Sequence, residues 1–214
     1  MAKIKAVTFD IDTTLTYGSS WTIITRELSA SVKTHEFIYK ELKENKISYK
    51  QAKEQLLNLW KATGNDNKNF FTKIFKNIYF KKGAQEIITY LKSKGIIICL
   101  ITGSVDLYAK TIAERLGIDN YFANTELVWD KNNKLVDFHY DINQSAKKLK
   151  QFLHFCSQQK INTNDFYVVG DDENDIDLFK FTKKGIAIES EKIDKLKPYA
   201  WKVINNLSEI KKLV

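Results

Sequence analysis

Four short apolar runs along the chain have the composition of buried parallel strands, and each is followed by a segment with helical spacing. These runs are IKAVTFDI (residues 4–11), IIICLITG (96–103), DFYVVGD (165–171) and GIAI (185–188). Alternation of such strands with helices predicts an α/β fold with a doubly wound, mainly parallel sheet. Sheets of this kind bind ligands beyond the carboxyl ends of their strands.

The remaining pattern predicts smaller elements. Residues 116–140 alternate between apolar and polar positions around Asn132-Asn133, which predicts a β-hairpin. After GIAI, residues 192–200 predict a short helix and residues 201–204 a last strand. The segment NLSEIKKL predicts a terminal helix capped by Asn206 or Ser208.

One stretch interrupts the alternation of strands and helices. From Trp21 to Ile78 the chain shows only helical periodicities, with breaks near His35, near Ile47 and at residues 64–66. We therefore expect a core of residues 1–16 and 80–214 with an inserted helical cap of residues 17–79. Because the insertion follows the first strand directly, it leaves the sheet at the ligand-binding edge, which favours a cap over a purely structural subdomain.

The composition is that of a soluble globular protein. The chain has 214 residues, of which 43% are hydrophobic and 28% charged, and this suits one domain with a modest insertion. No run approaches the ~20 apolar residues of a membrane helix, and the start shows no apolar leader. Cys99 and Cys156 belong to no CxxC pair. We therefore expect a cytoplasmic protein with no membrane partner.

The formal net charge of +8 raises the question of a nucleic-acid partner. However, the lysines are spread along the whole sequence, and the only arginines are Arg26 and Arg115. Nucleic-acid binders more often use arginine and a clustered patch. We therefore expect no nucleic-acid partner; steep salt dependence of duplex binding would argue otherwise.

Polar residues follow the first three strand runs at the point where each ends. The first ends in Asp10 and Asp12, the second in Thr102-Gly103-Ser104, and the third in residues 170–175, GDDEND. Each motif alone is weak, since Asp and Thr also open ordinary turns. Together, at the ends of neighbouring parallel strands, they converge on one crevice. Asp10, Asp12 and Asp171 then offer hard oxygen ligands suited to Mg²⁺, which offsets their mutual repulsion.

The motifs DIDTT (residues 10–14), ITGS (101–104), a lysine at 147 or 148, and GDDEND resemble, in this order, the four motifs of the haloacid dehalogenase superfamily. Residues 81–129 resemble its phosphoserine phosphatase branch. The resemblance implies a Rossmann-like core with a helical cap between the first two motifs. It also implies a Mg²⁺-dependent phosphatase that acts on a small phosphorylated metabolite.

The resemblance further implies roles for individual residues. Asp10 is the nucleophile that becomes an aspartyl phosphate, and Asp12 is the general acid and base. Asp10, Asp171 and the backbone carbonyl of Asp12 are metal ligands, and Asp175 orients the metal site. The residues implied to contact the phosphate or the substrate are Thr102, Gly103, the motif lysine and Asn174.

Two lysines compete for the third motif. In the branch this lysine precedes the metal aspartate by about 23 residues, and 171 − 148 = 23 selects Lys148. Phe152 and Phe155 then follow at the apolar spacing of a helix that packs on the sheet. The local sequence SAK (residues 145–147) instead resembles the family motif with Lys147 as its lysine. We favour Lys148 and keep Lys147 as the alternative.

The chain also departs from the family. Thr13 and Asp172 stand where the family often has glycine. Phosphoserine phosphatases carry a glutamate nine residues after the nucleophile, for the serine ammonium, and a cap arginine for its carboxylate. Here the first position is Ser19, and SYKQAKEQLL, the region comparable to the second, has no arginine. We therefore expect the reaction to be preserved and the serine-recognition residues to be lacking.

A second hypothesis is a receiver-type signalling domain that is phosphorylated on aspartate and binds a partner. Receivers also combine acidic pairs, threonine and lysine on a doubly wound sheet. However, they have no helical insertion after the first strand, and their phosphorylated aspartate ends a later strand. The pattern therefore favours the phosphatase.

Overall fold

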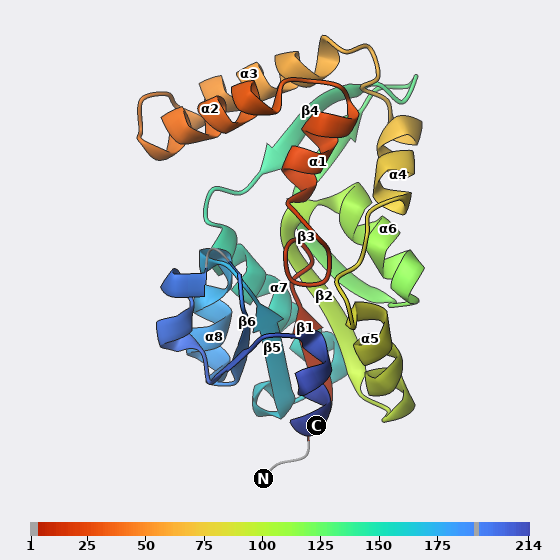
Figure 1. The fold of residues 1–214 in the computed structure, drawn as a ribbon, viewed down its shortest axis with the longest axis vertical. Coiled ribbons are helices and arrows are strands. Elements are labelled where there is room, and N and C mark those ends of the chain that lie inside the picture. Colours follow the sequence, from red (N-terminus) through yellow and green to blue (C-terminus); the bar gives the residue numbers. More distant parts are fainter. Residues whose placement is uncertain (1–3, 191–192) are drawn as a thin grey trace.

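The computed structural model describes residues 4–190 and 193–214. They form a seven-stranded sheet in the order β4-β3-β2-β1-β5-β6-β7 (Figure 1). Its strands are β1 (Ala6–Phe9), β2 (Ile97–Val105), β3 (Asn120–Trp129), β4 (Leu135–Tyr140), β5 (Phe166–Gly170), β6 (Gly185–Ile188) and β7 (Lys202–Ile204). Only the β3–β4 pair is antiparallel among these strands. The predicted doubly wound, mainly parallel sheet is confirmed, as is the hairpin.

Helices cover both faces of the sheet. Helices α7 (Gln144–Gln159) and α8 (Ile176–Thr182) bury phenylalanines on one face. Helices α5 (Ala84–Ser93) and α6 (Asp106–Leu116), with the terminal 3-10 helix η5 (Leu207–Lys212), cover the other. Strand β1 is fully buried between β2 and β5. Strands β2 and β3 lie on one side of β1, and β5 and β6 lie on the other. The carboxyl end of β1 is therefore a topological switch point, where such sheets bind ligands.

Along the chain, four helices follow β1 and precede α5, and we call them the helical region (Figure 1). They are α1 (Ser20–Glu27), α2 (Val32–Lys43), α3 (Tyr49–Lys61) and α4 (Lys68–Lys76). The predicted breaks near Ile47 and at residues 64–66 are confirmed. The break predicted near His35 is wrong, because Ser31 caps α2 through Thr34 N–H and so places His35 inside its first turns.

The β3–β4 hairpin extends from the sheet to the helical region (Figure 1). Its Phe138 ring lies 5.4 Å from Trp21 of α1, and its Tyr140 ring stacks on Tyr49 of α3 at 5.6 Å. Lys53 of α3 also pairs with Asp137 at 2.8 Å. The hairpin falls in the range predicted as core, yet its far end packs on the helical region. It therefore supports that region from the sheet.

The C-terminal segment differs from the prediction in detail. Residues 193–200 form two short 3-10 turns, η3 (Ile193–Lys195) and η4 (Lys197–Tyr199), rather than one helix, and position 192 lies outside the described residues. Pro198 explains the interruption, since it has no N–H and restricts the residue before it. The terminal helix is capped by Asn206, which forms a capping box with Glu209. Within residues 4–190 and 193–214, no helix is long and apolar enough to cross a membrane.

A hydrogen-bonded network lies inside the helical region. Trp60 Nε1 donates to Thr25 Oγ1 at 2.8 Å, and His35 Nδ1 lies 2.6 Å from the same hydroxyl. Trp60 is fully buried, and burial lowers the pKa of His35 despite the opposing charge of Glu36. A protonated His35 is therefore disfavoured in the folded protein.

We expect His35 to make the folded protein sensitive to acid. Its pKa is about 6.5 when unfolded and lower when folded, so the stability it contributes is complete above pH 7. That stability is lost as the pH falls below 6.5, because the unfolded chain then binds the proton more tightly. Urea unfolding should show that the free energy of unfolding falls more between pH 8 and pH 5 in the wild type than in His35→Asn. The exposed His154, changed to Asn, is the control; equal losses in wild type and His35→Asn would contradict the expectation.

Candidate active site

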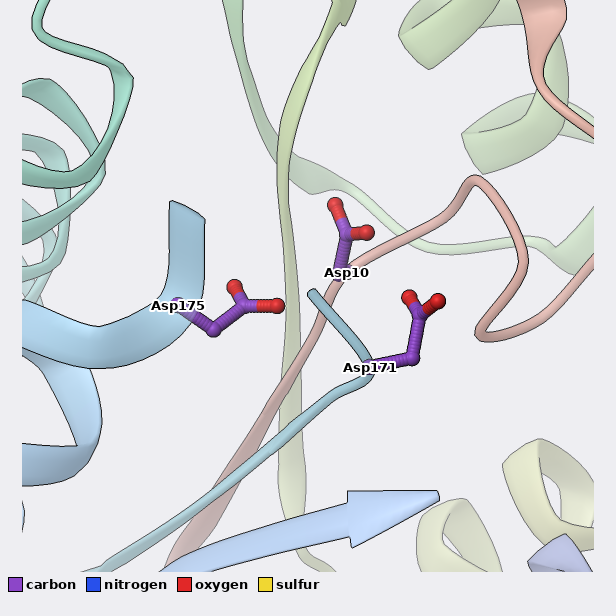
Figure 2. A group of neighbouring side chains, drawn as sticks. All are labelled: Asp10, Asp171 and Asp175. Atoms are coloured by element: carbon purple, nitrogen blue, oxygen red, sulfur yellow. The ribbon is translucent and has the colours of Figure 1, made fainter. Parts of the chain in front are cut away.

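Three buried carboxylates meet at the carboxyl ends of β1 and β5 (Figure 2). Asp10 directly follows β1, Asp171 follows β5, and Asp175 lies in the 3-10 turn η2 (Glu173–Asp175). One oxygen from each lies within 4.8 Å of the others, and no side chain of the three is more than 5% exposed. Burial and the charge of Asp10 raise the pKa of Asp171 to about 6. Such a concentration of carboxylates favours a bound cation.

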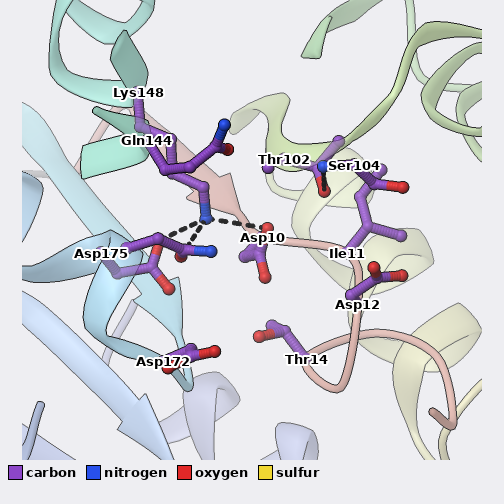
Figure 3. Close-up of polar contacts among 12 residues, drawn as sticks. Asp10, Ile11, Asp12, Thr14, Thr102, Ser104, Gln144, Lys148, Asp172 and Asp175 are labelled. Carbon is purple, nitrogen blue, oxygen red and sulfur yellow. Dashed lines mark hydrogen bonds and ion pairs between the residues drawn. The ribbon is translucent and has the colours of Figure 1, made fainter. Parts of the chain in front are cut away.

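The ammonium of Lys148, on α7, balances part of this charge (Figure 3). Its Nζ lies 2.9 Å from Asp10 Oδ1 and 2.7 Å from Asp175 Oδ1, and it donates to Asn174 Oδ1 at 2.7 Å. Burial opposes the charge on Lys148, but the two aspartates outweigh it and raise its pKa. Lys147 points elsewhere and donates to the carbonyl of Asn124 at 2.8 Å. The site is therefore built around Lys148.

Asp175 is fixed by its packing as well as by Lys148. Burial raises the pKa of Asp175 to about 7, although Lys148 lowers it. A Cβ atom at Gly170 would lie 2.2 Å from Asp175 Oδ2, so only glycine fits beneath this carboxylate. Oδ2 has no hydrogen-bond partner among the described residues. One oxygen of Asp175 thus meets the lysine, and the other is left for a further ligand.

Two threonines hold Asp171. Thr13 Oγ1 donates to Asp171 Oδ2 at 2.5 Å, and Thr14 Oγ1 donates to Oδ1 at 2.8 Å. Thr13 has φ 54, in the left-handed region where a β-branched residue is strained and glycine is favoured. In this chain the hydroxyl of Thr13 provides a hydrogen bond to Asp171 that glycine cannot.

Asp12 lies apart from Lys148 and Asp175 (Figure 3), and its carboxylate contacts Ser20, the first residue of α1. Ser20 donates to it twice, from N–H to Oδ1 at 3.1 Å and from Oγ to Oδ2 at 2.6 Å. Burial raises the pKa of Asp12 to about 7, although the hydrogen bonds from Ser20 oppose this shift. A carboxyl group with this pKa can give and take a proton near neutral pH.

The Thr102-Gly103 segment of β2 forms another wall of the site. Thr102 Oγ1 accepts from Ser104 N–H at 3.2 Å. A Cβ atom at Gly103 would lie 2.8 Å from Gln144 Oε1 and 3.2 Å from Asn174 Nδ2, so the two carboxamides approach here because residue 103 is glycine. Gln144 is held in turn by Asn124 Nδ2 at 2.7 Å.

The structure thus brings Asp10, Asp171, Asp175, Lys148 and Asn174 together, with Gly103 against Asn174. Sequence reasoning missed three residues that hold these groups, which are Ser20, Asn124 and Gln144. It placed Ser104 at this strand end but did not predict its contact with Ser20. Ser20 and Gln144 are the first residues of α1 and α7, where serine and other small polar residues are common for reasons of capping alone. No local pattern marks either of them.

An ion pair joins the helical region to the loop that follows β5. Lys43 of α2 lies 3.1 Å from Glu173 Oε1, and Lys195 lies 2.6 Å from Glu173 Oε2. These side chains are exposed by 53%, 37% and 71%. An exposed ion pair contributes only about 0–1 kcal/mol. This pair therefore adds little to the attachment of the helical region, which is held mainly by buried packing against the sheet and α6 and by the hydrogen bonds of Ser20.

Comparison with known proteins identifies the class. Residues 4–180 match the family model of the haloacid dehalogenase-like hydrolases, and the chain belongs to this family. It is similar to a phosphoserine phosphatase of Methanocaldococcus jannaschii, with 31% identity over 87% of this chain and 85% of that protein. It is also 24% identical to a phosphoserine phosphatase of Streptococcus thermophilus, over 99% of this chain and 100% of that protein.

Solved structures agree with this assignment. A phospho-aspartyl intermediate analogue of phosphoserine phosphatase superposes with a TM-score of 0.77 and 28% identity over 99% of both chains. A substrate-bound phosphoserine phosphatase complex also gives a TM-score of 0.77 and 28% identity, over 100% of both chains. The protein is therefore a phosphoserine phosphatase-like hydrolase of this family. The match favours the hydrolase over the receiver hypothesis.

We expect Lys148→Met and Lys147→Met to have very different effects. The first leaves two buried carboxylates without their cation, which should cost about 3–5 kcal/mol of unfolding free energy at neutral pH. The second removes one hydrogen bond to a carbonyl, worth about 1–3 kcal/mol at most. The Lys148→Met deficit should shrink toward pH 5, because protonation relieves the carboxylates. Urea unfolding measures both; equal deficits would contradict the arrangement around Lys148.

Proposed function

We propose that the protein is a Mg²⁺-dependent phosphatase that hydrolyses a small phosphomonoester through an aspartyl phosphate on Asp10. The observation that carries the proposal is the buried Asp10 carboxylate at the end of β1, 2.9 Å from Lys148 and grouped with two further aspartates. The similarity to a phospho-aspartyl analogue structure supports it.

The carboxylate group fits a magnesium ion in its chemistry. Mg²⁺ prefers oxygen ligands and usually takes one or two protein carboxylates together with substrate phosphate oxygens. Asp10, Asp171 and the backbone carbonyl of Asp12 would hold it, and Asp175, with one unpartnered oxygen, would orient the site. When bound, the ion offsets negative charge on the phosphoryl oxygens and favours the ionised form of Asp10.

The residues of this chain then divide the reaction between them. A carboxylate oxygen of Asp10 attacks phosphorus while the bond to the ester oxygen breaks, and Asp12 gives its proton to that departing oxygen. Asp12 next takes a proton from water, whose oxygen attacks phosphorus and releases Asp10. A pKa of about 7 at Asp12 suits both proton transfers. Lys148, Asn174, Thr102 and the amide of Gly103 bind the phosphate or the substrate.

In this proposal residues 17–79 form a cap that covers a core of residues 1–16 and 80–214. The helical region begins ten residues after Asp10 and returns to the core at Lys81, whose N–H donates to the Leu15 carbonyl. The two chain crossings lie side by side, with Thr16 bridged to Phe80, and this is where a hinge of the cap would have to be. The cap excludes water and selects the substrate.

The cap lacks the groups that recognise serine in the phosphoserine phosphatase branch. Ser19 cannot pair with an ammonium group as glutamate would. The cap's own arginine, Arg26, lies 3.1 Å from Glu27 with 62% of its side chain exposed. From Tyr17 to Phe80 the chain carries 11 Lys+Arg and 6 Asp+Glu, a balance of 11 − 6 = +5. We therefore propose a substrate with little positive charge and a second anionic or ring-bearing group.

Asp10→Asn should keep the fold and abolish Mg²⁺-dependent turnover of p-nitrophenyl phosphate, because an amide cannot act as the nucleophile. It should also prevent the binding of beryllium fluoride as a phosphate mimic, and fluorine-19 NMR detects this binding. Unfolding in urea is the control for the fold. A variant that retained most of the wild-type activity would show that the nucleophile is a different residue.

Phosphoserine should be a poor substrate beside sugar phosphates and nucleoside monophosphates, since the cap has no carboxylate at position 19 for the ammonium group. Phosphate release from a panel of these compounds gives kcat/KM for each. The advantage of the more anionic compounds should shrink as salt rises, because salt screens the cap's positive charge. A kcat/KM for phosphoserine above all the others would reject this substrate class.

A further inference from the structure

Ser20 holds both carboxylate oxygens of Asp12. Its N–H reaches Oδ1 at 3.1 Å and its Oγ reaches Oδ2 at 2.6 Å, and Ser20 itself is 0% exposed. Two donors from one residue fix the rotation of a carboxylate as well as its position. Ser20 is also the first residue of α1, so this contact ties Asp12 to the start of the helical region.

Ser104 supports Ser20 from the sheet. The two hydroxyls are hydrogen-bonded to each other, and Ser104 is 1% exposed on β2. The backbone N–H of Ser104 donates to Thr102 Oγ1 at 3.2 Å, which places it firmly in the strand end. The hydroxyl of Ser20 therefore has partners on two sides, and these partners select its rotamer.

We infer that Ser20 is a positioning residue that aims the carboxyl group of Asp12 at the leaving-group oxygen, with Ser104 as its support. The inference rests on the proposed function, in which Asp12 transfers a proton to that oxygen. Because Ser20 begins α1, the aim of Asp12 is coupled to the placement of the cap.

A purely structural role for Ser20 makes a different prediction. The Asp12 carboxylate also accepts from the N-terminus of α1, where the side chain of Ser19 makes no capping hydrogen bond. Loss of a cap lowers the stability of the folded enzyme and so reduces the folded fraction for every substrate equally. Misalignment of a general acid slows only reactions whose leaving group needs the proton. The ratio of rates for two leaving groups separates the two roles.

The test compares enzyme phosphorylation by an alkyl ester, β-glycerol phosphate, with that by p-nitrophenyl phosphate in rapid-quench experiments at saturating Mg²⁺. Ser20→Ala should slow the alkyl reaction by roughly tenfold or more and the aryl reaction by less than about threefold. The KM values should change little. Ser20→Thr, which keeps a hydroxyl, should restore the alkyl rate. Ser31→Ala, which removes the cap of α2 far from Asp12, should leave the ratio of rates unchanged.

Equal losses for both esters in Ser20→Ala, unchanged rates for both, or no rescue by Ser20→Thr would each overturn the inference. The ratio does not depend on the fraction of folded enzyme, so partial unfolding of a variant does not obscure it. A wild-type protein without Mg²⁺-dependent hydrolysis of either ester would reject the proposed function itself, and the inference with it. A phosphatase that is active but insensitive at Ser20 would reject the inference alone.

Discussion

Lys148 Nζ contacts Asp10 and Asp175 at 2.9 and 2.7 Å, with all three side chains closed off from solvent. A lone buried charge of either sign is very unfavourable, so each of these groups requires the others. The lysine comes from α7 and the aspartates follow β1 and β5, so this contact also requires that three elements meet at one sheet edge. Phe152 and Phe155 of α7 pack on the sheet and bring the lysine to that edge. The cluster still carries more negative than positive charge, which is the physical reason to expect a metal ion.

Around this centre, hydroxyl groups hold the remaining carboxylates. Thr13 and Thr14 bind Asp171 on one side, and Ser20, backed by Ser104, binds Asp12 on the other. The two sets differ in where they come from. The threonines belong to the loop that follows β1 and carries Asp10, so Asp171 is fixed by the sheet edge itself. Ser20 belongs to the helical region, so the environment of Asp12 depends on how that region sits over the sheet.

The fold and the charged centre could be predicted from the sequence because both leave strong local patterns. Buried parallel strands are continuous apolar runs, and the aspartates follow them directly. The residues that support the site leave no such pattern. Ser20 and Gln144 act on groups distant in the sequence, and the contact of the β3–β4 hairpin with α1 and α3 is set by tertiary packing. Spacing to Asp171 indicated Lys148, but only the position of α7 on the sheet shows which of two adjacent lysines faces Asp10. Two local errors show the same limit. The break predicted near His35 was displaced by the Ser31 cap of α2, and the helix predicted after Ile188 is divided at Pro198.

The central claim is that Asp10 carries the phosphoryl group during turnover. Rapid acid quench of wild-type protein during turnover of a phosphomonoester with Mg²⁺, followed by borohydride reduction, would convert an aspartyl phosphate into homoserine at that residue. Mass spectrometry of the peptide spanning residues 6–26 then locates the change. The account predicts homoserine at position 10, dependent on both substrate and Mg²⁺. Homoserine at another aspartate, or none while phosphate is being released, would contradict it.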